Sequence, residues 1–127
     1  MRIEHVAIWT RDLERLKAFY ETYFGARAGA RYASARRPFE SYFLRFPAGA
    51  RLELMRLPDL ADAQRGRDTV GLAHIAFATG SREQVDALTA RLRDDGYAIA
   101  DGPRVTGDGY YESVAIDPDG NRIEITA

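Results

Sequence analysis

The 127-residue sequence contains no cysteine and only one lysine. The absence of cysteine excludes disulfide bonds, thiolate zinc sites and cysteine nucleophiles. The one lysine, Lys17, lies in a segment with the pattern of an amphipathic helix, which argues against a Schiff-base lysine. Covalent chemistry through a thiol or an amine is therefore disfavoured.

The sequence also lacks an excess of either charge and any long apolar run. It has 18 basic and 19 acidic residues and a pI near 6.1, which argues against a nucleic-acid partner. The longest uncharged stretch, residues 69–81, is too short to span a bilayer, and the first residues lack the apolar core of a signal peptide. With 46% hydrophobic and 29% charged residues, we expect a globular, cytoplasmic protein without a membrane partner.

Two segments of the sequence recur in its second half. The chain has two histidines, and similar strings surround them, Glu-His-Val-Ala-Ile at His5 and Ala-His-Ile-Ala-Phe at His74. A second string, Pro-x-Gly-x-Arg-aliphatic-Glu-aliphatic, contains Glu53 in one half and Glu124 in the other. The histidines are 69 residues apart and the glutamates 71, so the pattern indicates one unit used twice.

Each copy predicts the element order β-α-β-β-β. A strand at about residues 3–10 or 71–79 precedes a helix, and two closing strands form a hairpin over residues 47–50 or 118–121. The helix signals are Asp12 and Gly25 in the first copy, and Ser81 with Gln84, then Gly96, in the second.

The fold class predicted from this order is α+β. We expect a single domain over residues 1–127, made of two modules at about 1–57 and 70–127 that a polar linker, residues 58–69, joins.

Side-chain alternation places one polar residue opposite an aliphatic face in each of four predicted strands. These residues are His5, Glu53, His74 and Glu124. A lone strand histidine or glutamate is more often hydrogen-bonded or solvated than a ligand. Their recurrence at matched positions instead favours one divalent metal ion per site, and two imidazoles with two carboxylates suit Ni, Co, Zn, Mn or Fe.

The paired modules, the H-[VI]-A-[IF] openings and the D-P-D-G-N-R-I-E-I ending resemble the vicinal oxygen chelate superfamily. This superfamily includes glyoxalase I, extradiol dioxygenases, and fosfomycin and bleomycin resistance proteins. The resemblance covers essentially the whole chain and implies a glyoxalase-like fold, in which a curved mixed sheet surrounds a metal cavity. It implies that the metal ligands are His5, Glu53, His74 and Glu124. Two glutamates match glyoxalase I most closely, and for a chain of this length that resemblance implies a homodimer.

The same resemblance implies a metal-dependent lyase or isomerase that acts on a small 2-oxo or hemithioacetal substrate. The metal would hold two adjacent substrate oxygens, and a glutamate would move a proton between neighbouring carbons through an enediolate. Glu124 is the first candidate for this base and Glu53 the second. Where glyoxalase I has an arginine that binds a glutathione carboxylate, this chain has Trp9, which argues against a glutathione adduct.

Further residues are candidates for a substrate pocket near this site. Aromatic side chains would serve as its walls, and arginines would bind an anionic group, although surface arginines more often pair with nearby acids. The candidates are Trp9, Tyr110 and Tyr111 among the aromatic residues, and Arg51, Arg56 and Arg122 among the arginines.

Two other functions stay open from the sequence. An extradiol dioxygenase would use Fe(II) with His5, His74 and Glu124 as a facial triad, but the chain offers no further histidine for the pocket. A non-enzymatic drug-binding or resistance protein would need no metal, which the complete set of four ligands disfavours.

Overall fold

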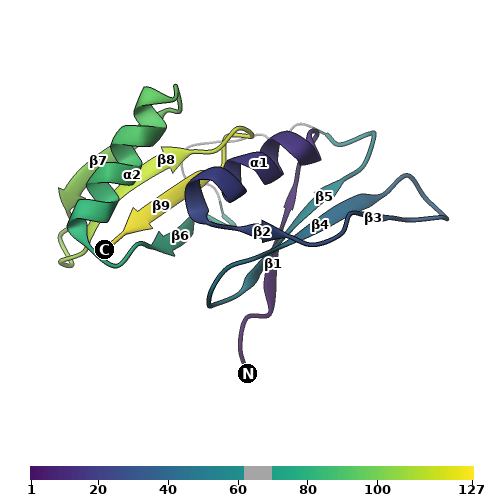
Figure 1. The fold of residues 1–127 in the computed structure, drawn as a ribbon, viewed down its shortest axis with the longest axis horizontal. Helices are drawn as coiled ribbons and strands as arrows, with labels where there is room; N and C mark the ends of the chain where they lie inside the picture. The colour runs from purple at the N-terminus through teal and green to yellow at the C-terminus, as the bar shows by residue number, and fades with distance from the viewer. Residues whose placement is uncertain (62–69) are drawn as a thin grey trace. The chain divides into compact units, whose positions relative to one another are not determined.

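The computed structural model describes residues 1–61 and 70–127 (Figure 1). It divides into two compact units, Met1–Gln64 and Arg65–Ala127. Residues 62–69 of the expected linker lie outside the described residues. In the part of the chain that is described, no helix is long and apolar enough to cross a membrane.

The first unit is a mixed sheet with a helix packed on one face. Its elements are β1 (His5–Trp9), α1 (Leu13–Phe24), β2 (Arg27–Ala28), β3 (Tyr32–Ala33), β4 (Glu40–Arg45) and β5 (Arg51–Arg56). The sheet order is β1-β5-β4-β2, and β3 also pairs with β4. β1 is parallel to β5, the other pairs are antiparallel, and α1 packs against β2, β4 and β5.

The strand expected directly after the helix is present in this unit but is interrupted, and it forms β2 and β3. Three residues separate β2 from β3, whereas two residues separate their pairing partners on β4. One extra residue is therefore accommodated, as in a β-bulge. The Gly29 amide still donates to the Phe43 carbonyl at 2.9 Å, so both short strands remain attached to β4.

The second unit has the predicted β-α-β-β-β order without interruption. Its elements are β6 (Ile75–Ala78), α2 (Arg82–Asp94), β7 (Ile99–Val105), β8 (Tyr111–Ile116) and β9 (Arg122–Thr126). The sheet order is β6-β9-β8-β7, in which β6 is parallel to β9, and α2 packs against β7, β8 and β9. The α+β fold of two modules is therefore confirmed.

The helices begin and end close to the predicted residues. The Asp12 side chain accepts a hydrogen bond from the Arg15 amide at 3.0 Å, and Gly25 ends α1 with a φ of 64°. The Ser81 hydroxyl accepts from the Gln84 amide at 3.3 Å, as a capping residue does. Helix α2 ends at Asp94, two residues before the predicted Gly96.

Alternating side chains give each sheet a buried and an open face. Leu52 and Leu54 of β5 are buried beneath α1, and Ile123 and Ile125 of β9 are buried beneath α2. The residues between them, Glu53 and Glu124, are less buried. The aliphatic face therefore orients the polar residues toward the open face of each sheet.

Candidate metal centre

The parallel strand pair has the same register in both units. Ala7 of β1 lies opposite Glu53 of β5, and Ala76 of β6 lies opposite Glu124 of β9. A histidine precedes each alanine by two residues: His5 begins β1, and His74 stands immediately before β6. The structure thus brings a histidine and a glutamate together at equivalent positions of each unit.

The His74–Glu124 pair has a spacing that suits two ligands of one metal ion, and the His5–Glu53 pair is about 0.5 Å wider than that. The Nε2 atom of His74 is 3.4 Å from Oε2 of Glu124, and the Nε2 atom of His5 is 3.9 Å from Oε2 of Glu53. Two ligand atoms about 2.1 Å from one ion lie about 3.0–3.4 Å apart for angles between a right angle and the tetrahedral angle. The histidine side chains are 40–44% exposed and the glutamate side chains 15–18% exposed, so both pairs can be reached from solvent.

Each pair supplies two ligands and no more. Within residues 1–61 and 70–127, no group of three or more His, Cys, Asp or Glu side chains is placed to hold a metal ion. Most metal sites need at least three protein ligands. A single pair is therefore half of a ligand set.

The His5 ring is oriented by a carboxylate. Its Nδ1 atom is 2.6 Å from Oε2 of Glu4, and because an ionised carboxylate only accepts, Nδ1 must carry the proton. The hydrogen bond from His5, followed by one from Arg51, lowers the pKa of Glu4. Arg51 donates to Glu4 through Nε at 2.8 Å and lies 4.0 Å over the Phe43 ring. This arrangement leaves the His5 Nε2 lone pair available on the side of Glu53.

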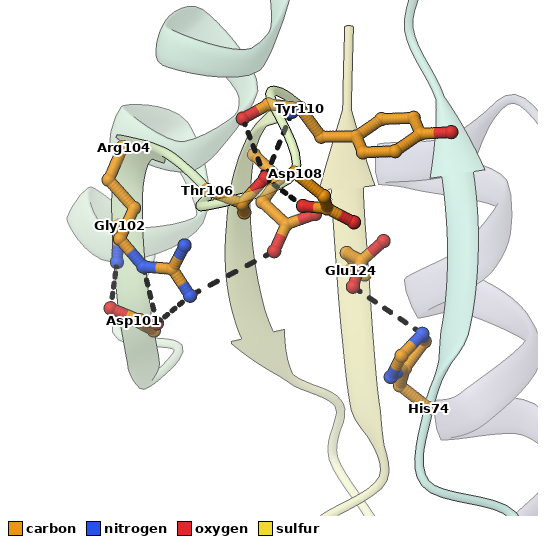
Figure 2. Close-up of polar contacts among 9 residues, drawn as sticks. His74, Asp101, Gly102, Arg104, Thr106, Asp108, Tyr110 and Glu124 are labelled. Atoms are coloured by element: carbon orange, nitrogen blue, oxygen red, sulfur yellow. Dashed lines mark hydrogen bonds and ion pairs between the residues drawn. The ribbon is translucent and has the colours of Figure 1, made fainter.

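Glu124 has a different neighbour, a second glutamate. Glu112 of β8 lies beside it, and burial, then the charge of Glu124, raises the pKa of Glu112. Arg104 lies 3.9 Å from Glu112 and also contacts Asp101, so a row of charged groups crosses the sheet of the second unit (Figure 2). Glu112 lies outside the repeated motifs that predicted the four ligands. Alternation from Glu124 through the paired strand was the signal that could have found it.

Trp9 lies on the same face of β1 as His5 and is 45% exposed. Its ring meets the Phe39 ring edge-on at 6.2 Å, and Phe39 also contacts Tyr32 at 6.2 Å. The structure therefore adds two aromatic residues that the sequence analysis did not single out. Together Trp9, Phe39 and Tyr32 form what we call the aromatic cluster of the first unit.

The other residues predicted for a substrate pocket lie in different surroundings from one another. The Tyr111 hydroxyl donates to Asp86 of α2 at 2.6 Å, so Tyr111 lies on the helix-covered face and not beside Glu124. Tyr110 is exposed in the β7–β8 loop, and Arg122 is exposed on the face of β9 that carries Glu124. Arg56 donates to Glu40 at 3.0 Å.

The family model described as the Glyoxalase/Bleomycin resistance protein/Dioxygenase superfamily matches residues 2–125. The chain belongs to this superfamily. The match covers both units and all four residues of the His–Glu pairs, and it agrees with the resemblance identified from the sequence motifs.

Solved structures share the fold over nearly the whole chain. A structure of a possible glyoxalase from Bacillus cereus is 25% identical, with a TM-score of 0.73, and the alignment covers 100% of this chain and 99% of that one. Glyoxalase I of Leishmania major is 22% identical, with a TM-score of 0.79 and coverages of 99% and 86%. A V278E mutant of glyoxalase I from Zea mays is 24% identical, with a TM-score of 0.81 and coverages of 98% and 44%. At this low identity, the Leishmania and maize enzymes establish the fold alone.

A curated sequence also matches part of the chain. The uncharacterized protein YqjT of Bacillus subtilis is 39% identical over 64 residues, which are 48% of this chain and 50% of that protein. The match thus spans about half the length of this relative.

Proposed function

We propose that the protein is a metal-dependent lyase or isomerase of the glyoxalase I type that acts on a small 2-oxo or hemithioacetal compound. The observation that carries this proposal is the recurrence of a His–Glu pair at the same strand register in both units. Membership of a superfamily that contains glyoxalases supports it. Each unit adds support of its own: the first has an exposed aromatic cluster, and the second has a carboxyl group, Glu112, whose pKa is raised by burial.

The two pairs would together hold one divalent cation of the Ni, Co, Zn, Mn or Fe group, within one chain or across a homodimer. Two imidazole nitrogens and two carboxylate oxygens are a suitable ligand set for these ions. The cation would supply Lewis-acid stabilisation of the negative charge that develops on two neighbouring substrate oxygens.

The proton transfer is assigned first to Glu124. Its carboxylate would accept a proton from the carbon next to the carbonyl group and return it to the adjacent carbon, so the reaction needs no redox partner. The second candidate, Glu53, lies between Ala7 and Phe43 on its neighbouring strands. Glu124 instead has a second carboxyl group beside it, which makes the two glutamates inequivalent.

The substrate is expected to lack the carboxylates of glutathione. Trp9 presents an apolar ring where a cation would be needed, and Arg51 is already engaged by Glu4. The aromatic cluster of the first unit favours an apolar substituent on the substrate.

The test is turnover of hemithioacetals formed from methylglyoxal and a panel of small uncharged and charged thiols. Protein loaded with each of the five metals should form a thioester, and Glu124→Gln, compared with the parent at saturating metal, should reduce the rate by about 100-fold or more. Glu53→Gln is compared in parallel, and Glu40→Gln is the control for loss of a carboxylate outside the pairs. The proposed base is wrong if Glu124→Gln keeps full turnover. The proposed reaction is wrong if every combination of metal and thiol fails to give product.

A drug-binding role is the second candidate because exposed aromatic rings can hold a flat ligand without a metal. Trp9 and Tyr32 are 45% and 56% exposed. Quenching of the single tryptophan by aromatic ligands in metal-free protein would favour this role over catalysis. The extradiol alternative is not favoured by any observation, since the chain contains no histidine besides the two in the pairs.

A further inference from the structure

Glu112 lies on the open face of the second sheet, next to the candidate base. It is directly opposite Arg104 on β7 and Thr126 on β9, and directly opposed residues share a face. Thr126 is two residues from Glu124, so Glu112 is the diagonal neighbour of Glu124, at a distance that long side chains bridge. The Glu112 side chain is only 12% exposed.

Arg104, which is held by Asp101, lies on the other side of Glu112. The Arg104 guanidinium contacts Asp101 through Nε at 2.8 Å and through a terminal nitrogen at 2.6 Å, and the same terminal nitrogen is 3.9 Å from Glu112. Asp101 is itself held by the Gly102 amide at 2.8 Å. Figure 2 shows Asp101 and Arg104 together on one strand, with Glu124 and His74 farther across the sheet.

The first unit shows that the fold does not require a carboxylate at this place. The repeat aligns Glu112 with Ser41, a small buried residue of β4. It also aligns Thr126 with Met55, which lies beside Ser41. A largely buried glutamate costs free energy unless it has partners. Its presence in the second unit alone therefore calls for a role in that unit.

We propose that Glu112 is a positioning residue for Glu124: with Arg104 beside it on β7, its carboxyl group determines which oxygen of Glu124 faces His74. This role rests on the proposed metal centre. Glu112 is not itself a ligand in this arrangement, because the described residues contain no cluster of three metal-binding side chains. Groups that hold a ligating carboxylate from behind commonly affect metal affinity by about 10–100-fold.

A positioning role for Glu112 would also give Glu124 and Glu53 different surroundings. The cross-strand neighbour of Glu53 on β4 is Phe43, and the repeat places Ser41 where Glu124 has Glu112. An orienting carboxyl group is thus provided for Glu124 and not for Glu53. A glutamate that must both bind a metal and move a proton needs a controlled orientation, which matches the assignment of Glu124 as base.

The experiment is a Co²⁺ titration of metal-free protein, followed by visible absorption. We expect Glu112→Ala to weaken Co²⁺ binding by about tenfold or more and to alter the absorption bands, because the ligand oxygen is no longer oriented. Glu112→Gln should restore affinity to within about threefold, since glutamine keeps the length and can hydrogen-bond to Glu124. Glu40→Ala removes another arginine-paired carboxylate and should leave the spectrum unchanged.

The outcomes separate this role from the proposed function. If the parent binds Co²⁺ and Glu112→Ala binds it with the same affinity and spectrum, the positioning role is wrong and the metal centre stands. If Glu112→Ala loses affinity together with thermal stability, and Glu112→Gln recovers neither, Glu112 is merely structural and the proposal fails. If the parent binds no Co²⁺, the proposed function and this role both fail.

Discussion

Replacing Glu4 with alanine should change the tautomer of His5 without moving the backbone. Glu4 is 52% exposed and precedes β1, so its removal takes away no core contact. What it removes is the acceptor 2.6 Å from His5 Nδ1, together with the exposed ion pair to Arg51. In the parent, the neutral ring carries its proton on Nδ1 and keeps Nε2 free for a metal. In Glu4→Ala the preference for this tautomer is lost.

The size of the effect follows from the exposure of the pair. Partners of metal-binding histidines typically change metal affinity by 10–100-fold, and a half-exposed hydrogen bond is weakened by solvent. We therefore expect about a tenfold loss of divalent-metal affinity. The assay is ¹⁵N-detected NMR of the imidazole rings in metal-free protein, under alkaline conditions where both rings are neutral. The chain has only two histidines, so the spectrum contains two rings, and His74, preceded by alanine, is an internal control.

The reasoning is refuted if the parent His5 ring carries its proton on Nε2, or if Glu4→Ala leaves the tautomer unchanged. Glu4→Gln provides a graded comparison, because the amide oxygen still accepts from Nδ1 but carries no charge. It should keep the tautomer and show a smaller loss of metal affinity than Glu4→Ala.

Three further predictions concern stability and are checked by thermal or denaturant unfolding. Gly102→Ala should destabilise the protein by about 1–3 kcal/mol, because Gly102 has a φ of 74° and a Cβ would lie 2.5 Å from the Glu112 carbonyl oxygen. If the variant were as stable as the parent, this close approach between β7 and β8 would not constrain residue 102. Leu92→Ala should cost about 3–5 kcal/mol, because Leu92 belongs to α2 and is fully buried where that helix packs on the sheet, and a loss under 1 kcal/mol would contradict that packing. Glu40→Gln should lower the melting temperature at neutral pH, with the difference from the parent shrinking as the pH falls below 4.5. The hydrogen bond from Arg56, followed by that from Arg31, lowers the pKa of Glu40, so its ionised form stabilises the fold above 4.5 and this contribution is lost in acid. A difference that persists unchanged in acid would mean that the charge of Glu40 is not involved.

Much of the fold could be predicted because two simple signals agree. The repeat placed matching residues at nearly constant offsets, and strand alternation placed the histidines and glutamates opposite the aliphatic face. The parallel registers at Ala7–Glu53 and Ala76–Glu124 confirm that both signals report the same geometry. The caps at Asp12 and Ser81 were predictable because their hydrogen bonds are local.

The neighbours of the two pairs were harder to predict, since they depend on pairing between strands distant in sequence. Glu112 reaches Glu124 diagonally, which requires the β8–β9 register. Tyr110, Tyr111 and Glu112 are consecutive, and only the true strand boundary shows that Tyr111 points to α2 and Glu112 to the open face. The interruption between β2 and β3 reflects one extra residue between strands of two residues each, which are too short to show an alternating pattern.

The most direct test of the central claim is the divalent-metal stoichiometry of the protein and of two variants, His5→Ala and His74→Ala. Metal-free chains are titrated with Ni²⁺, Co²⁺, Zn²⁺, Mn²⁺ and Fe²⁺, the last without oxygen, and bound metal is measured by elemental analysis. The account predicts one tightly bound ion per chain in the parent and loss of tight binding in both variants, because the two pairs serve one ion. Absence of binding in the parent would contradict the metal centre. Two ions per chain in the parent, with one retained in each variant, would show instead that the pairs act as separate sites.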